Sequence, residues 1–214
     1  MPARHLYFIM TNTWNRLALL IFAVLSLLVA GELQAGVVVG GTRFIFPADK
    51  ESIAILLTNT SQESWLINSK INRPTRWAGG EVSTVPAPLL AAPPLILLKP
   101  GTTGTLRLLR TESDILPVDR ETLFELSIAS VPSGKVENQS VKVAMRSVFK
   151  LFWRPEGLPG DPLEAYQQLR WTRNSQGVQL TNPTPYYINL IQVSVNGKAL
   201  SNAGVEIGRA SCRE

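Results

Sequence analysis

The clearest structural pattern of this chain lies in residues 140–155, which read SVKVAMRSVFKLFWRP. Most odd-numbered positions are apolar and four even-numbered positions are basic: the apolar set is Val141, Val143, Met145, Phe149, Leu151 and Trp153, and the basic set is Lys142, Arg146, Lys150 and Arg154. A period of two predicts one long β-strand over residues 141–153, with an apolar face and a basic face. The strand should end at Arg154-Pro155, because proline has no amide hydrogen to donate and restricts the residue before it.

Shorter runs of the same kind fill the rest of the chain after residue 35. We predict strands at residues 37–46, 52–58, 65–71, 95–98, 104–109, 122–129, 168–171, 177–181 and 186–195. Clusters of Pro, Gly, Asn and Ser separate these runs, as in Lys99-Pro100-Gly101. Short strands with frequent turn sequences are typical of an all-β sandwich.

A domain boundary is predicted where the long strand ends. Residues 155–162 read PEGLPGDP, with three prolines and two glycines, which cannot continue a strand. Residues 36–155 are long enough for one complete sandwich of roughly 100 residues. Residues 156–206 are about half as long, so we expect them to be the start of a second, incomplete sandwich.

The amino-terminal 35 residues have the features of a secretory signal peptide. Arg16 precedes the uncharged run LALLIFAVLSLLVA, and a small residue, Ala35, precedes the expected cleavage point. A membrane anchor is the alternative interpretation, but the run is about 14 residues long and a spanning helix needs about 20. We expect export, and no membrane insertion of the chain after cleavage.

The last eight residues, 207–214, read IGRASCRE and continue neither an apolar period nor a turn pattern. We expect this segment to be a translated sequencing adapter rather than natural sequence. An ordinary polar tail is the alternative.

Composition excludes several functional classes. Residues 1–35 and 207–214 together hold four Arg and two Glu, which leaves 17 basic and 14 acidic residues between them, a net charge of +3. This balance does not favour nucleic acid as a partner. The single His is His5 and the single Cys is Cys212, so residues 36–206 contain no Ser-His-Asp triad, Cys-His pair or Cys/His zinc site. We expect no metal, cofactor or enzymatic activity, although a hydrolase with paired carboxylates stays formally open.

Four charged residues stand out by position. Arg43 lies between apolar residues in RFIF, and Lys150 lies within VFKLF, so each is either a solvated cation of a strand or a receptor for an anion. Glu121 and Arg154 are opposite in charge and stand near strand ends, so they could pair close to the domain boundary. An exposed pair would contribute only about 0–1 kcal/mol.

Four motifs resemble those of the periplasmic pilus-assembly chaperones, the chaperone–usher family of which PapD is the type member. In chain order these motifs are TRFIF at residues 42–46, DRETLF at 119–124, KLFWRP at 150–155 and NPTPYY at 182–187. The resemblance covers roughly residues 36–200. It implies two immunoglobulin-like β-sandwich domains set in an L shape, here with the second one truncated, and a location in the periplasm.

The resemblance also implies a function. Such chaperones bind one pilus or fimbrial subunit at a time and deliver it to an outer-membrane usher, lending a strand to complete the subunit's unfinished sandwich. By motif match, Arg43 and Lys150 would anchor the subunit's terminal carboxylate. Val141, Val143 and Met145 would be the donated side chains, and Glu121 and Arg154 would belong to an interdomain ion network.

Two points stay open at this stage. An exported immunoglobulin-like adhesive or structural surface module would share the fold but need neither the Arg43/Lys150 pair nor a donor strand. Self-association of the free protein through its own exposed strand is a further possible partnership.

Overall fold

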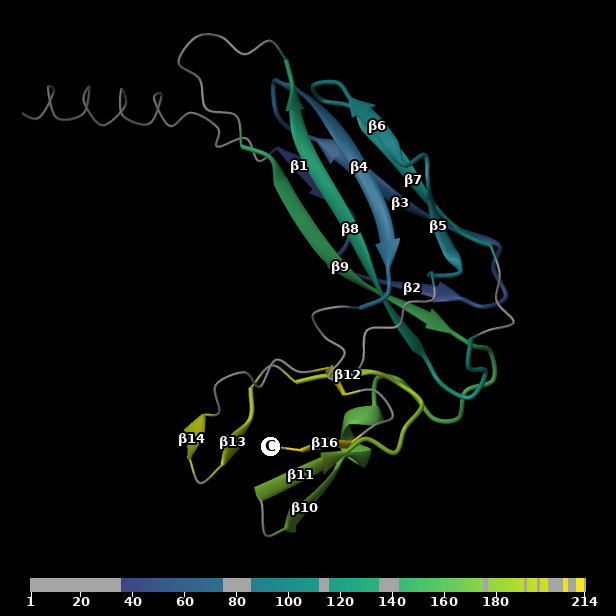
Figure 1. Ribbon diagram of the computed structural model, residues 1–214, viewed down its shortest axis with the longest axis vertical. Helices are drawn as coiled ribbons and strands as arrows, with labels where there is room; N and C mark the ends of the chain where they lie inside the picture. The colour runs from purple at the N-terminus through teal and green to yellow at the C-terminus, as the bar shows by residue number, and fades with distance from the viewer. Residues whose placement is uncertain are drawn as a thin grey trace, which may run out of the picture. The chain divides into compact units, whose positions relative to one another are not determined.

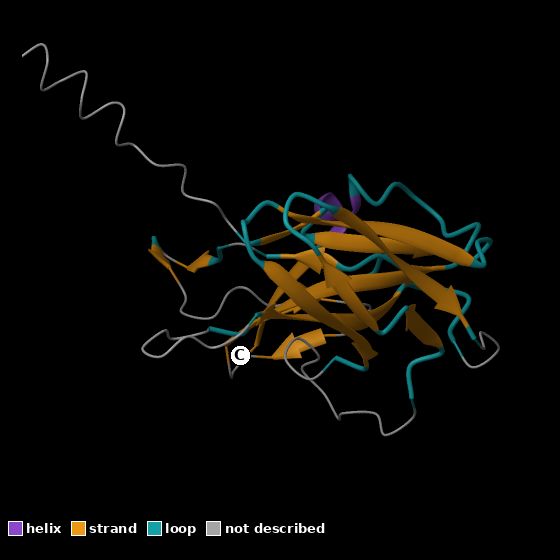
Figure 2. Cartoon of the chain, turned by 90° about the horizontal axis from the view of Figure 1, so that it is seen from above, coloured by secondary structure: helices purple, strands orange, loops and turns teal. Residues whose placement is uncertain are grey.

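In a computed structural model of the chain, the residues described are 36–74, 86–111, 116–134, 143–174, 177–190, 192–195, 197–199, 206–207 and 211–213. Almost all of the regular structure is β-strand, and one short 3-10 helix, η1 (Ala165–Gln168), is the exception among these residues (Figure 2). The all-β fold predicted from the period-two runs is confirmed. None of the helices in this described part is long and apolar enough to cross a membrane.

Two sheets form a sandwich between residues 37 and 154 (Figure 1). The four-stranded sheet has the order β1 (Val37–Val39), β3 (Ser52–Asn59), β7 (Thr103–Arg110), β5 (Leu89–Ala92). The five-stranded sheet has the order β2 (Arg43–Pro47), β9 (Met145–Arg154), β8 (Thr122–Ser133), β4 (Ser64–Asn72), β6 (Leu95–Leu98). All neighbours are antiparallel except β2 and β9, which are parallel.

The core lies between the two sheets and uses alternate residues of each strand. Its fully or almost fully buried members are Phe46, Ile55, Leu57, Ile67, Leu89, Ala91, Leu98, Leu106, Leu108, Phe124, Leu126, Ile128, Leu151 and Trp153. The rings of Phe46 and Trp153 stack with centroids 5.3 Å apart. Burial of each large apolar side chain stabilises the fold by about 1.5–3 kcal/mol, and this is the main force that holds the sheets together.

The run predicted as a single strand at residues 37–46 is in fact two strands in different sheets. The chain leaves the four-stranded sheet at Gly40, whose amide donates to the carbonyl of Leu56 at 3.0 Å. Gly41 then turns back on Val39, donating to its carbonyl at 2.8 Å. This tight turn breaks the period, so β2 starts in the other sheet at Arg43.

The long strand also differs from the expectation. β9 begins at Met145 rather than at residue 141, and Val141 lies outside the described residues. The prediction of one apolar and one basic face fails at its carboxyl end, where Leu151, Phe152 and Trp153 are all buried. Leu151 and Trp153 face the sandwich core, whereas Phe152 packs at 5.5 Å from the ring of Tyr187 on the opposite face. Both faces are covered there, so the alternation of burial disappears.

The part after residue 155 consists of short strands. Their bounds are β10 (Arg170–Asn174), β11 (Gly177–Thr181), β12 (Ile188–Asn189), β13 (Ser194–Val195), β14 (Lys198–Ala199), β15 (Glu206–Ile207) and β16 (Ser211–Arg213). β11 lies between β10 and β16, β12 pairs with β15, and β13 pairs with β14. The single strand predicted over residues 186–195 is therefore replaced by β12 and β13. A small core of Ala165, Tyr186 and Ile188 supports this part of the chain.

Candidate functional site

Three charged residues lie in one row across the five-stranded sheet. Arg43 of β2 is the register partner of Lys150 of β9, and Lys150 is the register partner of Glu125 of β8. Directly opposed residues of neighbouring strands point to the same face of a sheet. That face is the outer one, since the adjacent residues Phe124 and Leu151 belong to the sandwich core. We call Arg43, Lys150 and Glu125 the charged row.

The members of the charged row differ in exposure. Arg43 is exposed, Lys150 is half-buried and Glu125 is 5% exposed. The ammonium group of Lys150 donates a hydrogen bond to Oδ1 of Asn189 at 2.8 Å, and Asn189 is the last residue of β12. The lysine is thereby fixed from the part of the chain that follows residue 155.

An apolar layer lies beside the charged row on the same face. Phe152 and Leu123 are register partners, two positions away from Lys150 and Glu125, and are 5% and 2% exposed. The ring of Tyr187 lies against Phe152 with centroids 5.5 Å apart. The charged row is thus bordered on this side by buried apolar side chains, while Arg43 at one end of the row is exposed.

A second charged pair, Glu121 with Arg154, also connects the sandwich to the part of the chain that follows residue 155. Nε of Arg154 donates to Oε1 of Glu121 at 2.6 Å, and the backbone amide of Tyr187 donates to Oε2 of the same carboxylate at 2.8 Å. The backbone amide of Glu121 donates in turn to the carbonyl of Pro185 at 2.9 Å. The Glu121 side chain is 2% exposed and that of Arg154 is 28% exposed. A buried carboxylate with a cation and an amide as donors is well satisfied.

Hydrogen bonds within the turn at residues 182–187 hold it in contact with this pair. The side chain of Asn182 accepts from the amide of Thr184 at 3.0 Å and donates to the carbonyl of Tyr186 at 2.7 Å. The hydroxyl of Tyr186 donates to the carbonyl of Gly160 at 3.1 Å. The guanidinium of Arg154 lies 5.5 Å from the centroid of the Tyr186 ring. The sequence predicted a strand from residue 186 and a family motif at residues 182–187, and the structure adds that this turn contacts Glu121.

The amino-terminal half of β9 has an exposed edge. β2 pairs with β9 only from Lys150 to Arg154, so among the described strands none lies beside residues 145–149 on that edge. Val143 and Met145 are each 62% exposed. Unpaired backbone groups next to exposed apolar side chains are the features of a strand that can accept another strand.

Sequence reasoning brought four residues to attention that the structure places in two pairs, Arg43 with Lys150 and Glu121 with Arg154. It missed Asn189 and Glu125, and it placed Tyr187 in the NPTPYY motif without assigning it a contact. The partners of Asn189 and Tyr187 could not be read from the local sequence, because they lie 39 and 66 positions away. Glu125 did have a signal, since it is the only acidic residue in the predicted apolar strand at residues 122–129.

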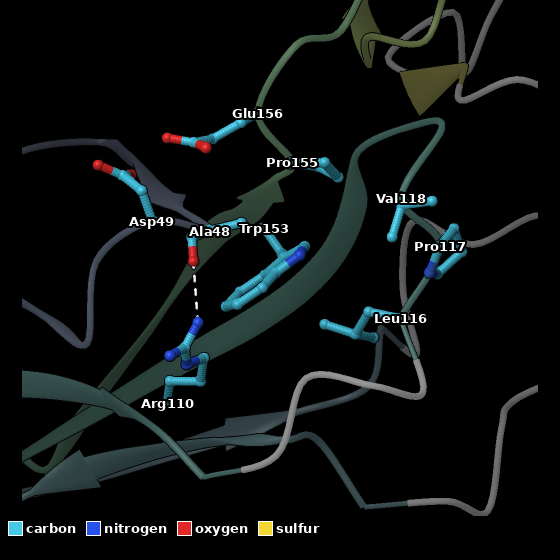
Figure 3. A pocket seen from close by; sticks show the side chains of 9 residues that line it. All are labelled: Ala48, Asp49, Arg110, Leu116, Pro117, Val118, Trp153, Pro155 and Glu156. Atoms are coloured by element: carbon cyan, nitrogen blue, oxygen red, sulfur yellow. Dashed lines mark hydrogen bonds between the residues drawn. The ribbon is translucent and has the colours of Figure 1, made fainter.

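A cavity of about 340 Å³ lies at the end of the sandwich core (Figure 3). Leu116 and Trp153 line it, and Asp49 and Glu156 contribute carboxylates to its wall. The guanidinium of Arg110 donates to the carbonyl of Ala48 across it at 2.9 Å. The cavity shares no lining residue with the charged row.

Two family models match the chain. The model of the pili and flagellar-assembly chaperone PapD amino-terminal domain matches residues 36–159, and that of the pili-assembly chaperone PapD carboxyl-terminal domain matches residues 164–207. These matches include every residue of the charged row.

Individual proteins agree with the family models. The chain is 98% identical over 196 residues to the fimbrial chaperone YcbF of Escherichia coli K12, covering 92% of this chain and 83% of that one. It is 32% identical over 187 residues to the chaperone FimC of the same strain, covering 86% and 75%.

Solved structures agree as well. The complex of the SafA pilin with the SafB chaperone of Salmonella enterica matches with a TM-score of 0.70 and 30% identity, covering 86% of this chain and 84% of that one. The Escherichia coli chaperone DraB matches with a TM-score of 0.69 and 27% identity, covering 83% and 82%. The predicted immunoglobulin-like sandwich fold is confirmed by these neighbours.

Proposed function

Because this chain belongs to the PapD family of pilus-assembly chaperones, we propose that it is a periplasmic chaperone that stabilises a pilus subunit by donor-strand complementation and delivers it to an outer-membrane usher. The observation that carries the proposal is the position of Arg43 and Lys150. They are register partners at the point where the exposed edge of β9 meets the first residue of β2.

The anchor follows from this position. An incoming strand that pairs with residues 145–149 of β9 occupies the edge that β2 leaves open, and its end meets Arg43. Two adjacent cations there can each donate a charge-assisted hydrogen bond to a chain-terminal carboxylate. If the carboxyl end lies at Lys150, the incoming strand must run parallel to β9, as β2 does.

The donor side chains lie on the same edge. Val143 and Met145 are exposed in this chain, and burying each in a partner's open core would contribute roughly 1.5–3 kcal/mol before ordering costs. Val141 is proposed as the third donated residue from its place in the motif. The carboxylate anchor also sets the register, and a slip of one residue would turn the donated side chains to the wrong face.

The secretory signal peptide predicted for residues 1–35 and the membership of the family support a periplasmic location. The two domains are proposed to divide near residue 155, and Glu121 with Arg154 is proposed as the ion network at that junction. The pilin in the complex that contains the SafB chaperone supports a pilus subunit as the partner class.

The proposal predicts that Lys150→Ala abolishes subunit binding and leaves the fold intact, because Lys150 lies on the outer face and not in the core. The test is a periplasmic pull-down of tagged chaperone coexpressed with the fimbrial subunit encoded beside it. Lys99→Ala, an exposed lysine in a turn remote from β9, is the matched control.

Each outcome decides between functions. Subunit recovered with wild type and Lys99→Ala, but not with Lys150→Ala, supports the anchored chaperone. Equal recovery with Lys150→Ala would show that the edge of β9 binds without an anchor. Recovery with none of the three would favour the exported adhesive or structural module instead.

A further inference from the structure

A buried carboxylate lies beside the proposed anchor. Glu125 is the register partner of Lys150 on β8, and it is 5% exposed. Its partner on the other side, across β4, is Asn72. Opposed residues of an antiparallel pair have Cβ atoms about 4.5–5.5 Å apart, so the carboxylate of Glu125 stands on the Lys150 side of the anchor and opposite Arg43.

The charged row holds two positive side chains and one negative side chain. Arg43 and Lys150 are adjacent like charges, and Glu125 compensates one of them. A terminal carboxylate that binds the two cations therefore brings a second negative charge close to Glu125. Water screens this repulsion only partly, since Glu125 is buried and Lys150 is half-buried.

We propose that Glu125 is an internal competitor for Lys150, which weakens the hold of the anchor on a subunit's terminal carboxylate and so favours release of the subunit. This inference rests on the proposed function, because it assumes that the Arg43/Lys150 pair receives a carboxylate. It deepens that function by assigning a residue to the release step, which two unopposed cations would impede.

The opposite role of Glu125 makes a different prediction. If Glu125 served only to hold Lys150 in position, removing its charge would loosen the lysine and weaken binding of a carboxylate. Asn189 already fixes Lys150 by the 2.8 Å hydrogen bond, so the lysine keeps a positioning partner when Glu125 is neutral. Competition therefore outweighs positioning, and the sign of the change in affinity separates the two roles.

The experiment uses the full chain and two synthetic peptides. Both have the sequence of the carboxyl-terminal strand of the fimbrial subunit encoded beside the chaperone, about 15 residues, enough to span the exposed edge. One ends in a free carboxylate and the other in an amide. Dissociation constants are measured by calorimetry for wild type, Glu125→Gln, Lys150→Ala and Glu51→Gln, the last being the same change at an exposed acid in the bend just before β3 of the other sheet.

We expect Glu125→Gln to bind the carboxylate peptide about tenfold more tightly than wild type and the amide peptide equally. Tenfold corresponds to removing one unit charge about 6 Å from the carboxylate, at an effective dielectric constant of about 40, between that of a protein surface and that of water. Glu51→Gln should match wild type with both peptides. Glu125→Met, which is neutral and of similar length, replaces Glu125→Gln if the latter does not fold.

Two results would overturn the inference. Unchanged or weaker binding of the carboxylate peptide by the neutral variants, with Lys150→Ala defective, would remove the competitor role and leave the proposed function standing. Retention of the preference for carboxylate over amide in Lys150→Ala would remove the anchor itself, and the inference with it.

Discussion

At the scale of single residues, Glu121 is the clearest example of a charge whose surroundings decide its energetic value. From the sequence alone, a pair with Arg154 would have the small value of a surface ion pair. In the structure the carboxylate is 2% exposed and accepts from both Arg154 and the amide of Tyr187. Its contribution is therefore that of a buried, fully satisfied group, and its loss leaves a guanidinium and an amide with one partner fewer.

Glu121→Gln should destabilise the protein by about 2–4 kcal/mol, because it removes the negative charge that satisfies Arg154 in a largely buried site. The measurement is the free energy of unfolding from urea titration. Asp119→Asn is the matched control, since Asp119 pairs with Arg120 on the surface with both side chains more than 40% exposed. The control should stay within about 0.5 kcal/mol of wild type, and an equally small change in Glu121→Gln would contradict the burial argument.

At the scale of the element, β9 has two halves with different surroundings. From Lys150 to Arg154 it lies between β2 and β8, and its residues alternate between the sandwich core and the contact with Tyr187. From Met145 to Phe149 it is paired on the β8 side, and Met145 is largely exposed. One strand thus combines a carboxyl-terminal half that is paired on both edges with an amino-terminal half that has one exposed edge.

Met145→Asp should prevent capture of a subunit without lowering the stability of the free protein. A side chain that is 62% exposed loses little when it becomes charged, but a charge cannot enter a partner's apolar groove without a large desolvation cost. Copurification and the melting temperature report the two effects. Leu90→Asp on β5 of the other sheet, where Leu90 is 51% exposed, should change neither, and loss of subunit there would mean that general surface apolarity drives binding.

Period-two alternation predicted β6 and β11 with their observed bounds and placed most strands of the sandwich. It failed where neighbours rather than the local sequence decide. Gly40 and Gly41 divide one apolar run between two sheets, and β5 was missed because its residues Leu89–Ala92 show no polar alternation. Phe152 is buried on the face expected to be solvated, because residues far along the chain cover it.

At the scale of the whole molecule, the residues of the candidate site come from regions that are distant in sequence. The four family motifs were sufficient to predict the family, and that prediction is confirmed by both family models. The roles given to Arg43, Lys150 and the donor residues stay predictions. The bond from Lys150 to Asn189 was beyond sequence reasoning, because no periodicity links positions 39 residues apart.

Asn189→Leu should weaken binding of a carboxylate-terminated peptide about fivefold to tenfold, since a hydrogen bond to a charged group is worth about 1.5–3 kcal/mol and solvent replaces part of it. The amidated peptide should bind as it does to wild type. Gln179→Leu, at a half-buried position of β11, is the control for the change of side chain. Equal loss with both peptides would indicate damage to the fold rather than to the orientation of Lys150.

The passage of the chain from one sheet to the other at Gly40 and Gly41 has a mechanical consequence. Residues 37–47 contribute β1 to one sheet and β2 to the other. A force that slides the two sheets past each other therefore acts on the pairing of β1 with β3 and on the pairing of β2 with β9 at the same time. Arg43 is the first residue of β2, directly after the turn that joins the two sheets. If an usher draws a bound subunit away as proposed, tension on the subunit's terminal carboxylate at Arg43 is therefore shared by both sheets of the sandwich.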